Sequence, residues 1–267
     1  MIKLAIHGAT GRMGRELLSG AFHREGVSVA AAIDRSDSPL IGQDSGLISH
    51  GQANGVLVAS DLPSVLPNCD VVIDFTHPTV TLSMLPACIS ARTPLVIGTT
   101  GFTEQQKSEL AQAATQLPIV FAPNMSPGVN LMFKLVELAT RALHEETDIE
   151  IVEAHHKHKV DAPSGTALKL GEVAAEASGC VLNEVGVFTR EGQTGARSEK
   201  EIGFSTIRAG DIVGEHTVLF AGSGERLEIT HKATHRKNFV QGALRAAEWL
   251  PGKEPGLYTM QQVLGLA

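Results

Sequence analysis

The feature that most constrains the fold of this chain is a short apolar strand that runs into a glycine-rich turn and then a helix. Residues 2–6 have the composition of a buried strand, residues 7–14 carry the glycines, and residues 15–22 repeat apolar side chains at helical spacing. Glycines in this context let the backbone and the helix start approach a pyrophosphate group closely. The spacing is Gly-x-x-Gly-x-x-Gly, with Thr10 where the commoner fingerprint has its second glycine, so a tight structural turn is the alternative interpretation.

Apolar strands continue to alternate with helical segments as far as residue 121. The predicted strands are residues 27–33, 55–59, 70–75, 94–97 and 118–121, the predicted helices are 62–66, 78–91 and 104–117, and residues 40–55 are predicted to be a surface loop. This alternation predicts an α/β fold with a Rossmann-type, doubly wound parallel sheet. Ligands of such sheets bind at the carboxyl ends of the strands, where the glycine turn and residues 34, 75–77, 98–100 and 122–125 all fall.

Two charged residues follow the second predicted strand, about 20 residues beyond the glycine turn. Asp34 is placed where an acid can bind the ribose hydroxyls of a dinucleotide. Arg35 comes next, and a guanidinium group there can instead pair with a 2′-phosphate. The two residues together predict tolerance of both NADH and NADPH, although a charged pair that merely ends a strand is the alternative.

The pattern changes after residue 126, which predicts a second and smaller domain. A helix is predicted at residues 127–145, strands at 148–154, 202–207, 213–220 and 226–231, hairpin turns at 209–211 and 222–224, and a loop at 184–201. These strands predict an open, mixed sheet of about four strands in an α+β domain. The amphipathic helix at residues 239–250 is assigned to the first domain, so the predicted domains are residues 1–126 completed by 237–267, and residues 127–236.

Titratable side chains are concentrated in one stretch of the second domain. A predicted strand leads into His155, His156, Lys157, His158 and Lys159, and Ser164 is then expected to cap a helix over residues 167–177. Helix N-termini bind anions, so the stretch predicts a site for a carboxylate-bearing substrate. A metal site is one alternative, but no Cys or second His pair lies nearby at ligand spacing. A solvated basic turn is the other alternative.

The same stretch resembles a family signature. Glu153-Ala-His-His, followed by Lys159-Val-Asp-Ala-Pro-Ser-Gly-Thr-Ala167, is similar to the signature of the 4-hydroxy-tetrahydrodipicolinate reductases, also called dihydrodipicolinate reductases, of bacterial lysine and diaminopimelate synthesis. The resemblance covers essentially the whole chain. It implies reduction of 4-hydroxy-tetrahydrodipicolinate, a small dicarboxylate, to tetrahydrodipicolinate with NADPH or NADH. It also implies a homotetramer that assembles through the sheet of the smaller domain.

The resemblance further implies a set of site residues. His155 would be the general acid/base and Lys159 a second proton donor, while His156 would bind substrate together with the backbone of Gly165 and Thr166. The residues implied in cofactor binding are Gly8, Ala9, Thr10, Gly11, Arg12, Met13, Asp34, Arg35, Gly98, Thr99, Thr100, Ala122, Pro123, Asn124 and Met125. Neighbouring residues of a strand point to opposite faces, so His155 and His156 serve one site only if the strand ends there. Lys157 and His158 match no role and are interpreted as solvated.

Composition excludes several other classes of protein. The net charge of −7 and the aromatic fraction of 4% argue against a nucleic-acid binder. No apolar run approaches the roughly 18 residues of a membrane span, and because the sequence opens directly as a predicted strand, no targeting peptide is expected. Three scattered cysteines indicate a reduced compartment, so the cytoplasm is expected. Two alternative functions remain: an oxidoreductase on another small amino- or keto-acid, and a non-catalytic dinucleotide sensor.

Overall fold

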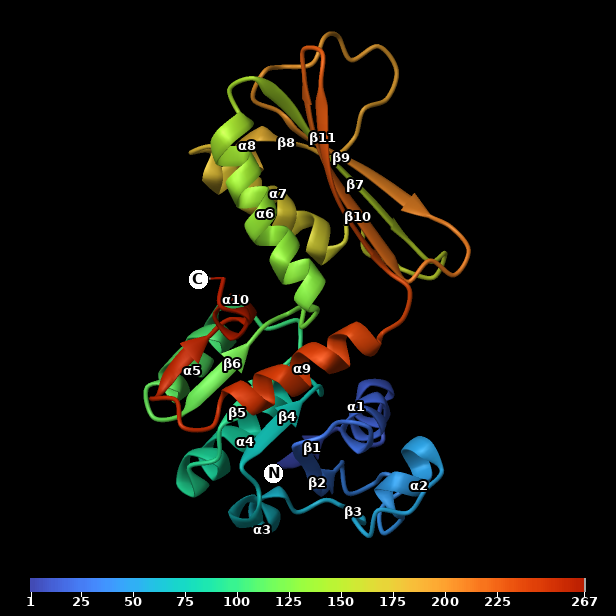
Figure 1. Cartoon of the computed structure of the whole chain (residues 1–267), viewed down its shortest axis with the longest axis vertical. Helices are drawn as coiled ribbons and strands as arrows, with labels where there is room; N and C mark the ends of the chain where they lie inside the picture. Colours follow the sequence, from blue (N-terminus) through green and yellow to red (C-terminus); the bar gives the residue numbers. More distant parts are fainter. Residues whose placement is uncertain (267) are drawn as a thin grey trace. The chain divides into compact units, whose positions relative to one another are not determined.

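The computed structural model describes residues 1–266, and the chain divides into two compact units. The first unit comprises Met1–Pro127 together with the segment from Lys237 onward, and the second comprises Gly128–Arg236. Each unit has its own sheet (Figure 1). Each also has its own apolar core. The chain therefore builds two separate scaffolds, and each is described by itself below.

The first unit is built on a parallel sheet that, within residues 1–266, has seven strands in the order β12-β6-β5-β4-β1-β2-β3. The strands are β1 (Ile2–His7), β2 (Val27–Ile33), β3 (Val58–Ala59), β4 (Val71–Asp74), β5 (Leu95–Ile97), β6 (Pro118–Phe121) and β12 (Gly256–Tyr258). The order reverses between β1 and β4, as in doubly wound sheets. The predicted Rossmann-type fold is thus confirmed.

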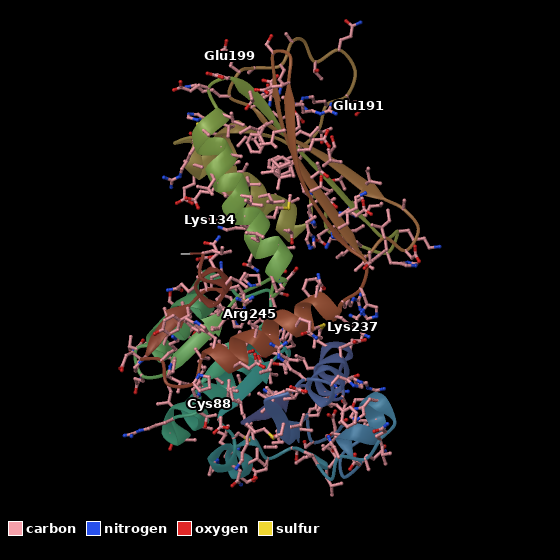
Figure 2. All side chains as sticks on the ribbon, viewed as in Figure 1. Cys88, Lys134, Glu191, Glu199, Lys237 and Arg245 are labelled. Carbon is pink, nitrogen blue, oxygen red and sulfur yellow. The ribbon has the colours of Figure 1, made fainter. Side chains whose placement is uncertain are left out.

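Helices cover both faces of this sheet. They are α1 (Arg12–Phe22), α2 (Ser45–His50), α3 (Leu62–Val65), α4 (Pro78–Ala91), α5 (Glu104–Ala114), α9 (Lys237–Trp249) and α10 (Met260–Leu264). Strand β1 shows why two layers form, because Leu4 and Ile6 pack with α1, α9 and α10 on one face while Ala5 packs with α3, α4 and α5 on the other. Cys88, labelled in Figure 2, is fully buried in the second of these layers. None of the helices within residues 1–266 has the length and hydropathy to cross a membrane.

One predicted loop of the first unit contains a helix. Residues 40–55 are polar and glycine-rich, yet they include α2. The Asp44 carboxylate caps this helix by accepting hydrogen bonds from the backbone N–H groups of Gly46 and Leu47, at 2.9 and 3.1 Å, and Gly51 ends it with a left-handed φ of 81°. Capping at both ends stabilises this helix although its sequence has little apolar periodicity. The short elements β12 and α10 were not predicted either.

The second unit is built on a mixed sheet of five strands within the described residues, in the order β11-β10-β7-β9-β8. The strands are β7 (Thr147–His155), β8 (Gly186–Val187), β9 (Ile202–Arg208), β10 (Gly214–Gly222) and β11 (Arg226–Ala233). The helices are α6 (Pro127–Leu143), α7 (Gly165–Ala177) and α8 (Leu182–Val185), and apolar residues of α6 and α7 pack with the sheet in one cluster. The predicted mixed sheet is confirmed, but β8 and part of α8 lie in the region predicted as a loop.

The pairing of the strands corrects a second prediction. The turn at residues 209–211 was expected to join a hairpin, but β9 and β10 are not neighbours, because β7 lies between them. Strand β7 pairs in parallel with β9 and antiparallel with β10. A glycine turn marks where the chain reverses but does not specify the partner strand. The other predicted hairpin, at residues 222–224, does join the antiparallel strands β10 and β11.

Candidate active site

The glycine turn of the first unit has the close backbone approach expected of a dinucleotide cradle. Gly8 has a left-handed φ of 79°, and Gly11 is the N-cap of α1. A Cβ atom added to Gly14 would lie 2.1 Å from the carbonyl oxygen of Gly8, so a side chain there would force the helix away from the strand. Each of the three glycines therefore has its own structural role. Gly8 turns the chain, Gly11 starts the helix and Gly14 lets the helix pack against β1.

Thr10 and Asp34 join this turn to the end of β2. Asp34 Oδ2 accepts hydrogen bonds from both the backbone N–H and the hydroxyl of Thr10, each at 2.7 Å. Arg35 is exposed and pairs with Asp37 at 3.0 Å. Thr10, at the position of the commoner second glycine, thus anchors the turn through its side chain. Asp34 holds the turn in addition to facing the ligand region.

A cavity of about 680 Å³ opens at this edge of the sheet. It is lined by the glycine turn, by the ends of β1 and β2 and by residues of α3 and α4, with Gly8, Thr10, Gly11, Asp34 and Arg35 among the lining residues. The close glycine packing, the exposed guanidinium and the strand-end carboxylate fit a dinucleotide with its pyrophosphate on the turn. The structure thus brings together five of the residues predicted to bind the cofactor.

The other predicted cofactor residues are not among the residues that line this cavity. Ala9, Ala122 and Met125 are buried in the core of the first unit. Thr100, Pro123 and Arg12 are exposed, while Met13 and Asn124 are partly buried. Gly98 leaves room for an aromatic ring, because a Cβ atom added there would lie 2.2 Å from the ring of Phe75.

A buried carboxylate that was not predicted connects several of these strand ends. Asp74 is fully buried at the end of β4 and accepts hydrogen bonds from the hydroxyls of Thr76 and Thr99, both at 2.8 Å, and from that of Thr81. His7 Nδ1, at the end of β1, lies 3.0 Å from Asp74 Oδ1. The side chain of Thr99 is therefore directed at Asp74 inside the unit. The signal in the sequence was an acid at the end of an apolar run followed by Thr76, but its partners are distant in the chain.

A second buried carboxylate organises the predicted substrate stretch. Glu153, only 1% exposed, accepts hydrogen bonds from His155 Nδ1 at 2.6 Å, from the backbone N–H of Ser164 at 3.0 Å and from Nη1 and Nη2 of Arg208, both at 2.8 Å. Strand β7 ends at His155, so the regular alternation does not separate His155 from His156 beyond that point. The strand thus ends where it must for both histidines to serve one site.

Burial and charge adjust the acid–base properties of this cluster. Burial acts to raise the pKa of Glu153, but the hydrogen bonds from Arg208 and His155 hold the pKa of its carboxyl group below the ordinary value. Burial lowers the pKa of His155, and the hydrogen bond to Glu153 opposes that change. Burial and the neighbouring His155 lower the pKa of His216 to about 4. At neutral pH the cluster thus contains a carboxylate and a neutral His216.

The start of α7 adjoins this cluster. Ser164 caps the helix as predicted, because its hydroxyl accepts from the N–H of Ala167 at 3.2 Å, and it also lies 3.0 Å from His216 Nε2. Lys159 is half-buried and pairs with Asp161 at 2.8 Å. Gly165 is exposed and has no atom within 4 Å of an added Cβ atom.

The other residues of the stretch are exposed or only partly buried. The structure also has three features at this cluster that were not predicted. Lys157 and His158 are exposed, and His156 is partly buried. Arg208, His216 and the buried state of Glu153 were not predicted, since they depend on strand pairing that the sequence does not reveal. His216 had a weak signal, a histidine at an inward position of an alternating strand. Within residues 1–266 no group of three or more His, Cys, Asp or Glu side chains has the arrangement of a metal site.

Comparison with known families decides the identity of the chain. The family model of the N-terminus of dihydrodipicolinate reductase matches residues 2–125, and that of the C-terminus matches residues 128–264. The chain belongs to the dihydrodipicolinate reductase family. It is therefore an NAD(P)H-dependent oxidoreductase that acts in lysine and diaminopimelate biosynthesis, where it reduces 4-hydroxy-tetrahydrodipicolinate. The predicted activity and cofactor class are confirmed.

Solved structures agree with this assignment. The dipicolinate-bound dihydrodipicolinate reductase from Paenisporosarcina sp. TG-14 has a TM-score of 0.78 and 29% identity, over 98% of each chain. An amine dehydrogenase from Mycobacterium smegmatis has a TM-score of 0.59 and 14% identity, over 97% of this chain and 95% of that one. GenD2 from gentamicin A biosynthesis, in complex with NAD, has a TM-score of 0.60 and 14% identity, over 99% and 90%. The last two share the fold alone.

The low pKa of His216 predicts how the stability of the reductase changes with pH. A histidine whose folded pKa of about 4 lies below its ordinary value of 6.5 binds fewer protons in the folded state than in the unfolded state. Its contribution to the free energy of unfolding is therefore complete above pH 6.5 and declines as the pH falls toward 4. Between pH 7 and 5, the wild type should lose about 2 kcal/mol more than His216→Gln. Urea denaturation followed by circular dichroism measures the free energy of unfolding at each pH. Equal losses in the wild type and in His216→Gln would contradict the lowered pKa of His216.

Proposed function

We propose that the two units divide the reaction, with the dinucleotide in the cradle of the first unit and the dicarboxylate at the start of α7 in the second. The observation that carries this proposal is the position of His155, held by Glu153 at the end of β7 and close in the chain to a capped helix start. The homologue of 29% identity binds dipicolinate, a planar dicarboxylate, which supports a substrate of the same class here.

The reduction needs a hydride, a proton and cations for two carboxylates. Overall, the substrate gains one hydride and one proton, and its hydroxyl group leaves as water together with one hydrogen of the ring. The bound NADPH or NADH supplies the hydride. His155 donates the proton from Nε2, because Nδ1 is engaged with Glu153, and Lys159 is the second proton donor. His156 and the backbone N–H groups of Gly165 and Thr166 bind substrate carboxylate, supported by the dipole of the 13-residue helix α7.

The oligomer and the cellular setting belong to the same proposal. We propose a homotetramer that forms through the sheet of the second unit. Helices α6 and α7 pack on the face that carries Ile149 and Ile151, while the alternation places Val152, Leu219 and Ile207, which is 46% exposed, on the opposite face. A cytoplasmic setting is supported by the free thiols of Cys69, Cys88 and Cys180.

His155→Gln tests the proton donor. The variant should lower kcat by about 10²–10⁴-fold, the usual contribution of a positioned general acid, while cofactor binding changes little. The measurement is oxidation of NADPH and of NADH in a coupled assay with enzymatically generated substrate. His158→Gln is the matched control, because His158 is exposed and lies three positions away on the same stretch. A near-normal kcat in His155→Gln would remove this residue from the mechanism.

Arg35→Ala tests the cofactor end of the cradle. Only NADPH carries the 2′-phosphate that a guanidinium group binds, so the variant should weaken NADPH binding far more than NADH binding. Asp37→Asn is the control, because it removes the carboxylate that pairs with Arg35 and should leave NADPH binding as tight or tighter. Fluorescence titration with both cofactors measures the effect. Equal losses of both cofactors in Arg35→Ala would argue against a 2′-phosphate contact.

Gly165→Val tests the start of α7. Dipicolinate should inhibit the wild type in competition with the substrate, and the valine should raise KM and abolish that inhibition by holding the ligand off the backbone N–H groups. The added Cβ atom meets no atom of the protein within 4 Å, so the thermal midpoint of the variant should stay within a few degrees. Unchanged inhibition in a folded Gly165→Val would return this helix start to a purely structural role.

A further inference from the structure

The buried Glu153 makes a set of contacts that a purely structural ion pair does not require. Its Oε2 atom accepts from both His155 Nδ1 and Arg208 Nη1, and its Oε1 atom accepts from Arg208 Nη2 and from the backbone N–H of Ser164. Both oxygens are thus saturated by donors from β7, β9 and the start of α7. The carboxylate has a fixed orientation, since rotating it would break several of these bonds at once.

The imidazole ring of His155 is fixed from two sides. Its Nδ1 atom is 2.6 Å from Glu153, which is a short hydrogen bond to a charged acceptor. Its Nε2 atom would lie 3.1 Å from a Cβ atom added to Gly214 on β10, so the glycine leaves room for the ring. Among the described residues, Nε2 has no hydrogen-bond partner. The contacts therefore occupy one ring nitrogen and leave the other for a ligand.

We propose that Glu153 is a positioning residue of the reduction, which holds the proton of neutral His155 on Nδ1 and stabilises the imidazolium that donates from Nε2. An ionised carboxylate accepts but does not donate hydrogen bonds, so it selects the nitrogen that carries the proton. The groups that face His155 are Arg208 from β9, His216 from β10 at a ring distance of 5.2 Å, Lys159 from the following loop and Glu153 itself. Glu153 is the anion among them, so it offsets the burial and the positive charges that act against the protonated ring.

The proposal also links proton donation to substrate binding. The Ser164 N–H that Glu153 holds belongs to the residue immediately before Gly165 and Thr166, the proposed carboxylate site. One carboxylate therefore sets both the orientation of the acid and the geometry of the helix start. This inference rests on the proposed role of His155.

The first test is the pH dependence of kcat in Glu153→Gln. The protonated form of His155 is the donor, so kcat of the wild type should fall as the pH rises through the pKa of this group in the enzyme. Removing the anion should move that alkaline limb to lower pH by about 1–3 units, the effect of losing an opposite charge at this distance. At neutral pH kcat should fall by up to about 10–10³-fold, because each pH unit of displacement lowers the protonated fraction at most tenfold, and it should recover in part as the pH is lowered. Glu153→Asp keeps the charge and should give a smaller displacement.

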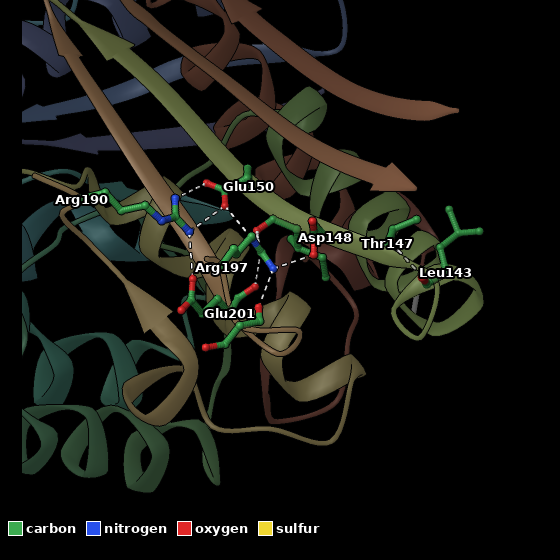
Figure 3. A network of polar contacts seen from close by, with 9 residues as sticks. Leu143, Thr147, Asp148, Glu150, Arg190, Arg197 and Glu201 are labelled. Atoms are coloured by element: carbon green, nitrogen blue, oxygen red, sulfur yellow. Dashed lines mark hydrogen bonds and ion pairs between the residues drawn. The ribbon is translucent and has the colours of Figure 1, made fainter. Parts of the chain in front are cut away.

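Glu150→Gln is the matched control on the same strand. Glu150 also lies on β7 and also binds a guanidinium group with two hydrogen bonds, from Arg190 at 3.0 and 2.9 Å (Figure 3). The alternation along the strand places it on the face opposite to Glu153. Arg197 binds Glu150 as well, at 3.1 Å. Its variant loses an ion pair with the same two-bond geometry, in which the carboxylate is 26% exposed against 1% for Glu153, and should leave the alkaline limb in place. If Glu153→Gln only rescales kcat, or if Glu150→Gln moves the limb equally, Glu153 is a structural residue and the proposal fails.

A second measurement needs no folded variant of Glu153. Nitrogen NMR of the wild type, with the His155 signals identified by their loss in His155→Gln, reports which ring nitrogen carries the proton above the pKa. The expected result is a protonated Nδ1 and an unprotonated Nε2, and the opposite tautomer would overturn the proposal. Failure of the underlying function looks different, because His155→Gln would then retain a near-normal kcat whatever the tautomer.

Discussion

A buried carboxylate near the carboxyl end of a central strand is the interaction on which each unit depends. Glu153 lies near the end of β7 and Asp74 ends β4. A carboxylate removed from water without partners costs several kcal/mol, so the surrounding segments must supply donors. In doing so, they become fixed themselves. The loops of the two proposed ligand sites are thereby ordered by these buried carboxylates.

The two carboxylates differ in the donors they recruit, and this difference separates their roles. Asp74 is surrounded by three threonine hydroxyls and by His7, so it joins β1, β4, β5 and α4 at the cofactor edge. Glu153 instead receives a guanidinium group and a ring nitrogen. Hydrogen bonds to charged donors keep it ionised, and an ionised group next to a histidine changes the acid–base chemistry of that histidine. Asp74 stabilises a scaffold, whereas Glu153 also adjusts the pKa of His155, the proposed general acid.

The sequence predicts most of the scaffold because its signals are local. The strand, glycine turn and helix at the start of the chain, and the Ser164 cap of α7, follow from spacing over a few residues, and the structure has them where expected. The family signature implied roles for His155 and Lys159, and these roles stay predictions. The helix α2 was missed because caps rather than apolar periodicity define it. The order of β7, β9 and β10 was missed because strand pairing depends on contacts between distant parts of the chain. Arg208 and His216 were not predicted as site residues either, because their positions depend on that order.

The two kinds of contact to Glu153 differ in how much chain they enclose. Ser164 is 11 residues away and Arg208 is 55, so the loop closed by the arginine costs roughly 1.4 kcal/mol more in chain entropy by length alone. The helix-start contact can form within one local segment, whereas the guanidinium arrives only when β9 pairs with β7. The guanidinium group that keeps Glu153 ionised is therefore in place only while β9 is paired with β7. The outer neighbour of β9 is the two-residue strand β8. A local opening at that edge of the sheet would expose the buried Glu153 and weaken the proposed proton donation by His155 while the rest of the unit is still folded.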